Sequence, residues 1–243
     1  MQIENLTVLV TGANRGIGRA FVAEALERGA RKVYAGVRDP SSADSALEEE
    51  SRVEILYLDI TDSDSIQSAA EAADDAALII NNAGVTIFDS VLEGSMAEAR
   101  GVFETNVFGS WDMARSFAPS LKNRKGALVN IVSAISWLSP PQNGAYAASK
   151  AAQWSLTNSL RLELAPHDVL VQGVHFGAVD TDFAKDYTGP KITPEEVASA
   201  SLDGVESEEN EVLVDESSRL AKAALTEEPN APLPSVEPNI LNP

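Results

Sequence analysis

Residues 6–18 read LTVLVTGANRGIG, and this stretch decides the fold. Its first five residues form a largely apolar run typical of a buried strand, and the residues from Ala20 to Leu26 carry apolar side chains at helical spacing. Glycines at positions 12, 16 and 18 have no Cβ and let the backbone approach a ligand. A helix that starts there offers unpaired N–H groups and a positive dipole end. The stretch therefore predicts a strand, a phosphate-binding glycine turn and a helix.

The same alternation continues along the chain, because short β-rich runs are followed by longer amphipathic segments. This pattern indicates β-α-β units and a parallel sheet, in which ligands bind at the carboxyl ends of the strands. The glycine turn, Asn82, Ser133 and Gly177 each follow an expected strand, so we expect them to meet at that edge. The expected strands lie near residues 5–10, 32–37, 53–58, 77–81, 126–132, 169–175 and 211–215.

Tyr146 and Lys150 are spaced one helical turn apart, and Ser133 precedes them at the end of an expected strand. Positions i and i+4 share a helix face, so the lysine ammonium can sit beneath the phenol oxygen and favour its ionised form. An ordinary tyrosine titrates near ~10, so a phenol that works as an acid or base at neutral pH needs such a cation. A serine hydroxyl can then orient a carbonyl or an alcohol. The three residues predict a proton-transfer site.

Several motifs occur together in the order and at the spacings of one known family. They are Thr11-Gly12-x-x-x-Gly16-Ile17-Gly18, Asn81-Asn82-Ala83-Gly84, Asn106, Ser133, Tyr146-x-x-x-Lys150 and Gly177-x-x-x-Thr181. From roughly residue 4 to 215 the chain resembles the short-chain dehydrogenase/reductases. The resemblance implies an α/β, three-layer doubly wound Rossmann fold with a seven-stranded parallel sheet, and NAD(H) or NADP(H) as cofactor. It also implies a catalytic tetrad of Asn106, Ser133, Tyr146 and Lys150.

The choice of cofactor depends on the end of the second expected strand. An acidic residue there would accept hydrogen bonds from the ribose hydroxyls of NAD, but Val37 occupies this position and Arg38 follows it. In the family, such an arginine and a basic residue before the second glycine, here Arg15, accompany the 2′-phosphate of NADP. A guanidinium matches a phosphate in charge and geometry. NADP(H) is therefore favoured over NAD(H), although a slip of one residue would bring Asp39 to the acidic position.

Further cofactor contacts follow from the resemblance alone. Asp59 is similar to the carboxylate that accepts from the adenine amino group, although it or Thr61 could instead cap the next helix. Thr181 would contact the nicotinamide carboxamide or the pyrophosphate. The full expected cofactor set is Gly12, Asn14, Arg15, Gly16, Ile17, Gly18, Arg38, Asp59, Ile60, Asn82, Ala83, Gly84, Tyr146, Lys150, Gly177 and Thr181.

The favoured function is a carbonyl reductase or alcohol dehydrogenase that uses NADP(H), with Tyr146 as the general acid or base. The expected substrate pocket contains Ile135, Trp137, Asn143 and Phe183, which favours a hydrophobic carbonyl compound or alcohol. One alternative is a regulatory or scaffold protein that binds the cofactor without turnover. Another is a lyase, but in the dehalogenating relatives the lysine is an arginine and the glycine turn is lost.

Composition limits the partners. A formal net charge of -19 would repel nucleic acid and anionic membranes, and no apolar run approaches membrane-spanning length. The chain has no cysteine and only two histidines, so we expect no metal site. We expect a soluble cytoplasmic protein with a single domain over residues 1–225. Residues 226–243 form a proline-rich tail that is either loosely ordered or draped on a neighbouring surface.

The chain departs from the family pattern at two places. Phe176 stands where relatives have a proline before Gly177, which leaves the backbone path there open. Glu216-Ser217-Ser218 stands where many relatives have two glycines, and residues 219–225 then look helical. Because relatives form a tetramer interface in this region, tetramers are not expected. A homodimer through the helices that carry Asn106 and Tyr146 and a monomer are the two states that stay open.

Overall fold

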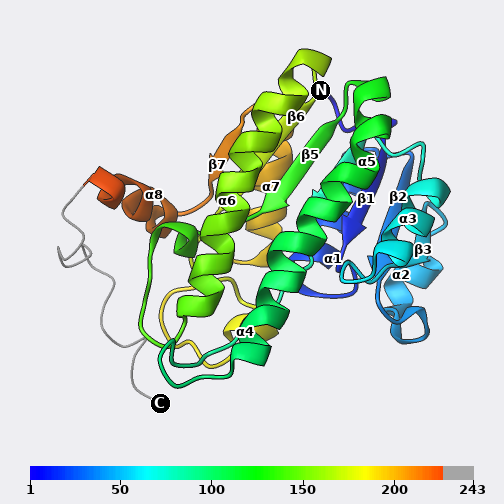
Figure 1. Ribbon diagram of the computed structural model, residues 1–243. Coiled ribbons are helices and arrows are strands. Elements are labelled where there is room, and N and C mark those ends of the chain that lie inside the picture. Colours follow the sequence, from blue (N-terminus) through cyan, green and yellow to red (C-terminus); the bar gives the residue numbers. More distant parts are fainter. Residues whose placement is uncertain (227–243) are drawn as a thin grey trace.

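The computed structural model describes residues 1–226, which form a parallel β-sheet covered by helices on both faces (Figure 1). The sheet has seven strands in the order β3-β2-β1-β4-β5-β6-β7. The expected three-layer Rossmann fold is confirmed, and every expected strand is present. Their bounds are β1 Thr7–Thr11, β2 Lys32–Val37, β3 Val53–Tyr57, β4 Leu78–Asn81, β5 Ala127–Ile131, β6 Leu170–His175 and β7 Glu211–Leu213.

The helices lie between the strands in the sequence and divide between the two faces of the sheet. Because side chains alternate along a strand, Val8 and Val10 of β1 pack on one face while Leu9 packs on the other. Both faces are buried, as is usual for a parallel sheet. The helices are α1 Gly16–Glu27, α2 Ser45–Glu49, α3 Ser63–Ala72, α4 Met96–Phe103, α5 Ser110–Arg124, α6 Gly144–Leu164, α7 Pro194–Glu206 and α8 Glu216–Ala223.

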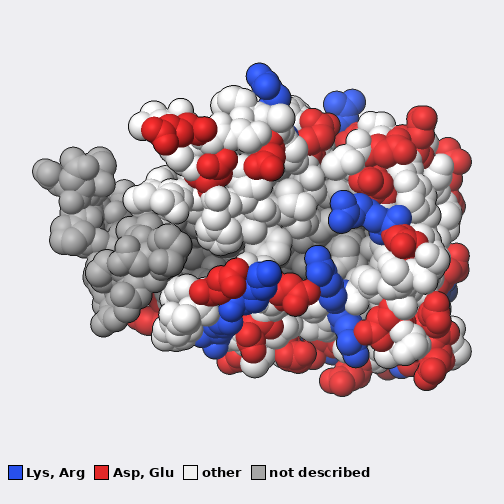
Figure 2. Space-filling view, turned by 90° about the horizontal axis from the view of Figure 1, so that it is seen from below, with Lys and Arg blue, Asp and Glu red and all other residues white. Residues whose placement is uncertain are grey.

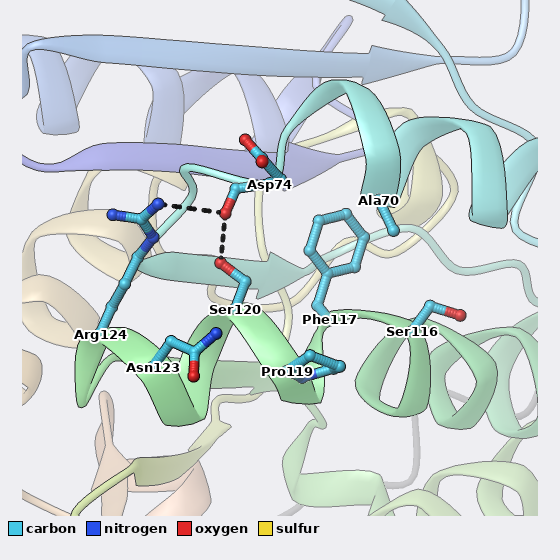
Figure 3. Close-up of a pocket in the computed structure, with 8 residues that line it drawn as sticks. All are labelled: Ala70, Asp74, Ser116, Phe117, Pro119, Ser120, Asn123 and Arg124. Carbon is cyan, nitrogen blue, oxygen red and sulfur yellow. Dashed lines mark hydrogen bonds between the residues drawn. The ribbon is translucent and has the colours of Figure 1, made fainter.

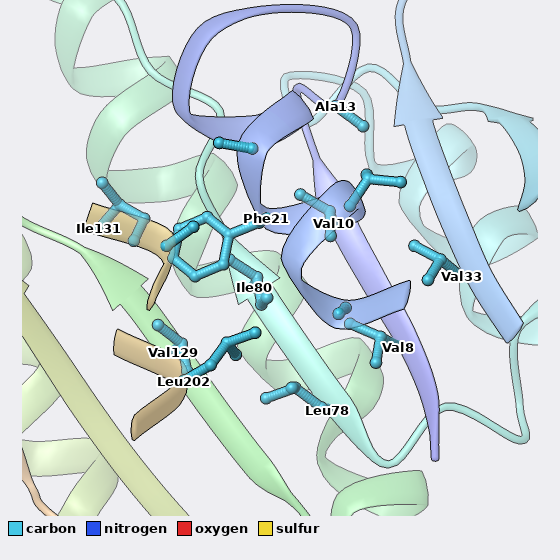
Figure 4. Packing of buried hydrophobic residues seen from close by; sticks show 14 of the residues in the cluster. Val8, Val10, Ala13, Phe21, Val33, Leu78, Ile80, Val129, Ile131 and Leu202 are labelled. Atoms are coloured by element: carbon cyan, nitrogen blue, oxygen red, sulfur yellow. The ribbon is translucent and has the colours of Figure 1, made fainter. Parts of the chain in front are cut away.

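One core lies between the sheet and the pair α1 and α7. Phe21 of α1 and Leu202 of α7 are fully buried against strand residues such as Ile80 and Val129 (Figure 4). The second core packs α3, α5 and α6 on the other face, with Ile66, Phe117 and Leu164 among its buried residues. The two cores hold the strands in place, so the carboxyl edge of the sheet is a rigid platform.

Strand order reverses between β1 and β4, because β1 pairs with both β2 and β4. In a doubly wound sheet, the crevice outside this switch point is where ligands bind. The glycine turn follows β1 and residues 82–84 follow β4, so both expected motifs flank the crevice.

No helix within residues 1–226 has the length and apolar character needed to cross a membrane. The expected proline-rich tail lies outside the described residues, except for Thr226.

Candidate active site

The glycine turn after β1 has a backbone path that only glycine adopts easily. Gly12 and Gly16 have φ angles of 65° and 53°. A Cβ on Gly18 would lie 2.2 Å from the carbonyl oxygen of Gly12, so this glycine permits close contact between the turn and α1. No side chain of the described residues caps the start of α1 at Arg15. The backbone N–H groups at this helix start are therefore available to a phosphate group, and the turn fits a dinucleotide.

The turn after β4 is bonded to the glycine turn. Thr11 Oγ1 accepts hydrogen bonds from the N–H groups of Asn82 and Ala83, at 3.0 and 2.9 Å. Asn82 Nδ2 donates to the carbonyl oxygens of Thr11 and Gly12, at 2.9 and 3.2 Å. Next to them, a Cβ on Gly84 would lie 3.2 Å from Asn106 Oδ1 and 3.8 Å from Lys150 Nζ. Residues 82–84 therefore connect the glycine turn to the expected tetrad.

The end of β2 agrees with the strand register used for the cofactor prediction. Val37 is the last residue of β2 and pairs with Tyr57 of β3, so Arg38 is the first residue of the loop. The Asp39 carboxylate accepts hydrogen bonds from the N–H and hydroxyl of Ser41, at 3.0 and 2.6 Å. Asp39 therefore lies in the loop after Arg38, engaged with Ser41.

Asn14 holds this loop against the glycine turn. Its Nδ2 donates to the carbonyl oxygen of Ser42 at 2.9 Å, and its Oδ1 accepts from the N–H of Asp44 at 2.7 Å. The expected cofactor residue Asn14 thus links the two segments that would bracket the adenosine ribose.

The basic residues at this edge differ in their partners. Arg15 forms an ion pair with Asp182 at 2.8 Å, and Arg19 forms one with Asp44 at 2.7 Å. Arg38 is exposed and makes no ion pair within residues 1–226. Figure 2 shows the face toward which the strands point, where acidic side chains predominate and Lys and Arg side chains lie near the middle. Arg38 can therefore take a phosphate without first breaking an ion pair.

The turn after β3 carries Asp59, the residue expected on the adenine side of the cofactor. Asp59 accepts hydrogen bonds from the N–H and hydroxyl of Thr61, at 2.9 and 2.7 Å. The N-cap of α3 is Asp62, whose side chain accepts from the N–H of Asp64. The alternative that Asp59 or Thr61 caps this helix is therefore wrong. Ile60 is buried and lies against Gly109, directly before α5, since a Cβ on this glycine would be 2.4 Å from the Ile60 carbonyl oxygen.

The loop after β6 reaches the glycine turn through Thr181. A Cβ on Gly16 would lie 3.2 Å from the Thr181 Cγ2 atom, so this threonine covers the turn. Gly177 is fixed from a distant segment, because its N–H donates to Asp215 Oδ2 at 3.0 Å. Asp215 also caps α8, and its role was missed from the sequence because it lies 38 residues from Gly177. Phe176 is buried in the core, which settles the backbone path before Gly177.

The structure brings the four expected tetrad residues into one region. Ser133 follows β5 with a φ of 127°, an uncommon conformation for a residue with a side chain. Tyr146 lies in the first turn of α6, and Lys150 lies one turn further with its Nζ 5.8 Å from the centre of the Tyr146 ring. Asn106 lies in a π-helical segment, Glu104–Gly109, between α4 and α5.

Asn106 is buried, and its side chain is fully engaged. Its Oδ1 accepts from the N–H of Val85 at 2.9 Å, and its Nδ2 donates to the carbonyl oxygen of Val85 and to Ser149 Oγ, at 2.9 and 3.0 Å. Ser149 lies on α6 directly before Lys150. The Asn106 side chain thus joins the turn after β4 to α6, the helix that carries Tyr146.

The charge states of Tyr146 and Lys150 depend on burial. Burial raises the pKa of Tyr146 above its usual value, while a hydrogen bond with Ser133 acts in the opposite direction. Burial is the larger effect in this arrangement, and the expectation that Lys150 lowers the pKa of Tyr146 stays a prediction. Burial also lowers the pKa of Lys150 from 10.5 to about 7. Lys150 Nζ instead donates to the carbonyl oxygen of Ile131 and to Gln153 Oε1, both at 2.8 Å.

The depressed pKa of Lys150 predicts a pH-dependent stability. Below about pH 7 the folded and unfolded chains both carry the proton, but between about 7 and 10.5 only the unfolded chain binds it. Unfolding then takes up a proton, so the free energy of unfolding rises with pH by up to about 1.4 kcal/mol per unit. We expect Lys150→Met to lack this rise. Denaturant unfolding at a series of pH values measures the difference between the two proteins.

Lys122→Met is the control for this prediction, because it removes an exposed lysine of α5. Its stability should run parallel to that of the wild type across the same pH range. If Lys150→Met also runs parallel to the wild type, Lys150 does not carry the shifted pKa.

The expected substrate residues do not all face Tyr146. Phe183 is 44% exposed, and its ring lies 5.9 Å from that of Tyr146. Ile135 follows Ser133 and donates its N–H to the serine Oγ at 3.3 Å. Asn143 is the N-cap residue of α6, the helix that carries Tyr146. Phe183 therefore borders the tyrosine, Ile135 lies next to Ser133, and Asn143 lies at the start of the helix that carries the tyrosine.

Trp137 instead packs toward β6 and α8. Its ring stacks on His175 at 4.0 Å, and Lys222 Nζ lies 5.7 Å from the ring centre. Burial lowers the pKa of His175 to about 4, so the imidazole is neutral at physiological pH. The ring of Trp137 thus has partners away from Tyr146, and its place in a substrate pocket stays a prediction.

A surface hollow lies apart from these residues. It is formed between α3 and α5, where Ser120 and Arg124 donate to the carbonyl oxygen of Asp74 at 2.8 and 3.3 Å (Figure 3). Neither the glycine turn nor any residue of the expected tetrad lines it, so it carries no part of the candidate site.

Comparison with known proteins agrees with this geometry. The sequence model of the short chain dehydrogenase family matches residues 6–191. A dehydrogenase/reductase SDR family member 7B from Xenopus tropicalis is 29% identical over 241 residues, covering 87% of this chain and 78% of that protein. The 3-oxoacyl-(acyl-carrier-protein) reductase FabG from Vibrio harveyi is 29% identical over 190 residues, covering 76% of this chain and 78% of the reductase.

A solved structure extends the match to the full chain. The short chain dehydrogenase from Burkholderia cenocepacia J2315, solved in complex with NADP, is 37% identical and superposes with a TM-score of 0.90 over 100% of both chains. Since the sequence motifs, the sheet topology and the family model all agree over most of its length, the chain belongs to the short-chain dehydrogenase/reductase family of oxidoreductases.

Proposed function

We propose that the protein interconverts a carbonyl compound and an alcohol and uses NADP(H). The observation that carries this proposal is the arrangement of Ser133, Tyr146 and Lys150 at the carboxyl edge of the sheet, next to the glycine turn. A nicotinamide dinucleotide bound there would supply or accept the hydride. Proton transfer is then left to the side chains of the protein.

Residues of three turns would hold the cofactor. The N–H groups at the start of α1 would bind the pyrophosphate, with Thr181 next to Gly16 on the same turn. Arg38 would take a ribose phosphate, because the position of the ribose-binding acid is Val37 and Asp39 is engaged with Ser41. The NADP in the Burkholderia cenocepacia relative, at 37% identity, supports this choice.

Tyr146 would donate its proton from Oη to the substrate oxygen, while the Ser133 hydroxyl would hold that oxygen in place. Because burial raises the pKa of the phenol, Tyr146 keeps its proton at neutral pH. The protonated phenol is the form that carbonyl reduction requires, so this direction is favoured. The Lys150 ammonium would stabilise the charge left on the phenolate.

An uncharged, hydrophobic substrate is supported by the groups around the phenol. The phenol itself is buried, and its pKa responds to burial and to Ser133. Phe183, whose ring lies next to that of the tyrosine, is apolar, and so is Ile135, which is bonded to Ser133. A hydrophobic carbonyl compound would therefore meet apolar side chains near the phenol.

The test is the absorbance of NADPH during incubation with a panel of ketones and aldehydes. We expect NADPH to be oxidised fastest with apolar carbonyl compounds and more slowly with carboxylated ones. If the protein binds NADPH tightly but none of the panel oxidises it, the protein is better described as a cofactor-binding regulator or scaffold.

A further inference from the structure

Gln153 is a buried polar residue of α6 that the proposed function does not use. It lies almost one turn after Lys150 and is 2% exposed. Its Oε1 accepts a hydrogen bond from Lys150 Nζ at 2.8 Å, and its Nε2 donates to Ser110 Oγ of α5 at 3.2 Å. Burying an amide is costly unless it is hydrogen-bonded, and here both ends are bonded. The position also lies on the same helix face as Lys150, which is the signal that could have identified it in the sequence.

The amide of Gln153 has only one orientation that suits Lys150. An ammonium carries donors and no acceptor, so an amide turned by 180° would set two donors against each other. Ser110 keeps the opposite end in place. Gln153 therefore presents a carbonyl oxygen to the lysine, in a position fixed from a second helix.

Gln153 belongs to a closed ring of hydrogen bonds between buried polar residues. Asn81 of β4 donates to the carbonyl oxygen of Ser110 and to Asn130 Oδ1 of β5. Asn130 donates to Thr157 Oγ1, and Thr157 donates to the main-chain oxygen of Gln153. This polar chain ties the helix position of Gln153 to two central strands, so the carbonyl oxygen cannot move away from Lys150 without breaking it.

We infer that Gln153 is a positioning residue that holds the Lys150 ammonium in place and favours its charged form. The role of Lys150 in turnover rests on the proposed function, whereas the hydrogen bond between Lys150 and Gln153 does not depend on it. Two protons of the ammonium are bonded to Ile131 and Gln153, which leaves one for a bound ligand.

Charged neighbours do not supply this stabilisation. The titratable groups that face Lys150 are Tyr146 of α6 itself and His175 of β6. Segments packed against α6 present the uncharged Ile131 and Asn106. No carboxylate within residues 1–226 forms an ion pair with Lys150, whose pKa is lowered by burial alone. The two carbonyl oxygens are therefore what opposes the loss of the proton.

Two substitutions at this position should act in opposite directions. Gln153→Met keeps the length of the side chain and removes the acceptor, which disfavours the charged lysine. Gln153→Glu replaces the amide oxygen with an anion, which favours it. Because reduction requires the charged form of Lys150, kcat/KM falls as pH rises through the lysine pKa. We expect this basic limb to move down by about one pH unit in Gln153→Met and up in Gln153→Glu.

Thr157→Val is the matched control, because it breaks the same buried chain without touching Lys150. It should lower the melting temperature and leave the basic limb in place. A role of Gln153 in packing alone would make Gln153→Met behave like this control.

A second readout does not depend on activity. In protein with 15N-labelled lysine, NMR follows the titration of the Lys150 side chain, whose signal is assigned by its loss in Lys150→Met. We expect the midpoint to fall in Gln153→Met and to rise in Gln153→Glu. Equal midpoints in all variants, or shifts in the same direction, would overturn the inference. If the wild type reduces no carbonyl compound, the proposed function fails while this titration still decides the role of Gln153.

Discussion

Tyr146→Phe should lower kcat for carbonyl reduction by about a thousandfold while NADPH still binds. The substitution removes one hydroxyl and keeps the ring that packs at 5.9 Å from Phe183. Without the phenol proton, the alkoxide formed from the substrate has no nearby acid of the right geometry. Ser133 cannot replace it, because a serine hydroxyl is a much weaker acid than a phenol. Steady-state kinetics with the best ketone of the panel, together with NADPH fluorescence titration, measure the two effects separately.

Tyr57→Phe serves as the control for this substitution. Tyr57 is 54% exposed at the end of β3, away from α6, and its loss of a hydroxyl should leave kcat unchanged. Turnover of Tyr146→Phe at the wild-type rate would contradict the proposed proton transfer. A loss of NADPH binding in the same variant would instead show that the phenol acts mainly in holding the cofactor.

Arg38→Asp should shift the cofactor preference from NADPH to NADH by about a hundredfold in the ratio of kcat/KM. The arginine is exposed at the end of β2 and makes no ion pair within residues 1–226, so its replacement breaks no internal contact there. The new carboxylate would repel a 2′-phosphate and accept hydrogen bonds from ribose hydroxyls. Both changes act in the same direction. Parallel kinetics with the two cofactors measure the ratio.

Arg124→Asp is the matched control, because it makes the same change of charge on an exposed residue near the end of α5 (Figure 3). It should leave the ratio of kcat/KM for NADPH and NADH as it is in the wild type. This control separates a contact between Arg38 and the cofactor from an effect of net charge. An unchanged ratio in Arg38→Asp would mean that this arginine does not meet the ribose phosphate, whatever the cofactor preference of the protein.

Much of the fold could be predicted because its signals are local. A β-strand shows as a run of apolar residues, and the glycine turn shows as a spacing that few other structures require. All expected strands are found, and β2 ends at Val37 as the cofactor prediction assumed. The cap of α3 was less predictable, because Asp59, Thr61 and Asp62 all have suitable side chains and lie close together in the sequence.

The candidate site was only partly predictable. Motif order placed the expected tetrad, but the sequence did not indicate that Asp215 holds Gly177 or that Trp137 stacks on His175. These contacts join residues 38 positions apart in both cases, and nothing in the local pattern relates the partners. Gln153 is an intermediate case, since its spacing from Lys150 is visible in the sequence while its contact with Ser110 is not.

By itself, the sequence determined the strand pattern, the glycine turn and the residue types that meet at the carboxyl edge, because hydrophobic periodicity and backbone freedom are properties of short segments. Only the tertiary structure decided how burial shifts the pKa values of the two site residues. Burial raises the pKa of Tyr146 and lowers that of Lys150, which the sequence did not indicate. The cost of removing a charge from water depends on everything that packs around it, so it appears only when the helices close over the sheet.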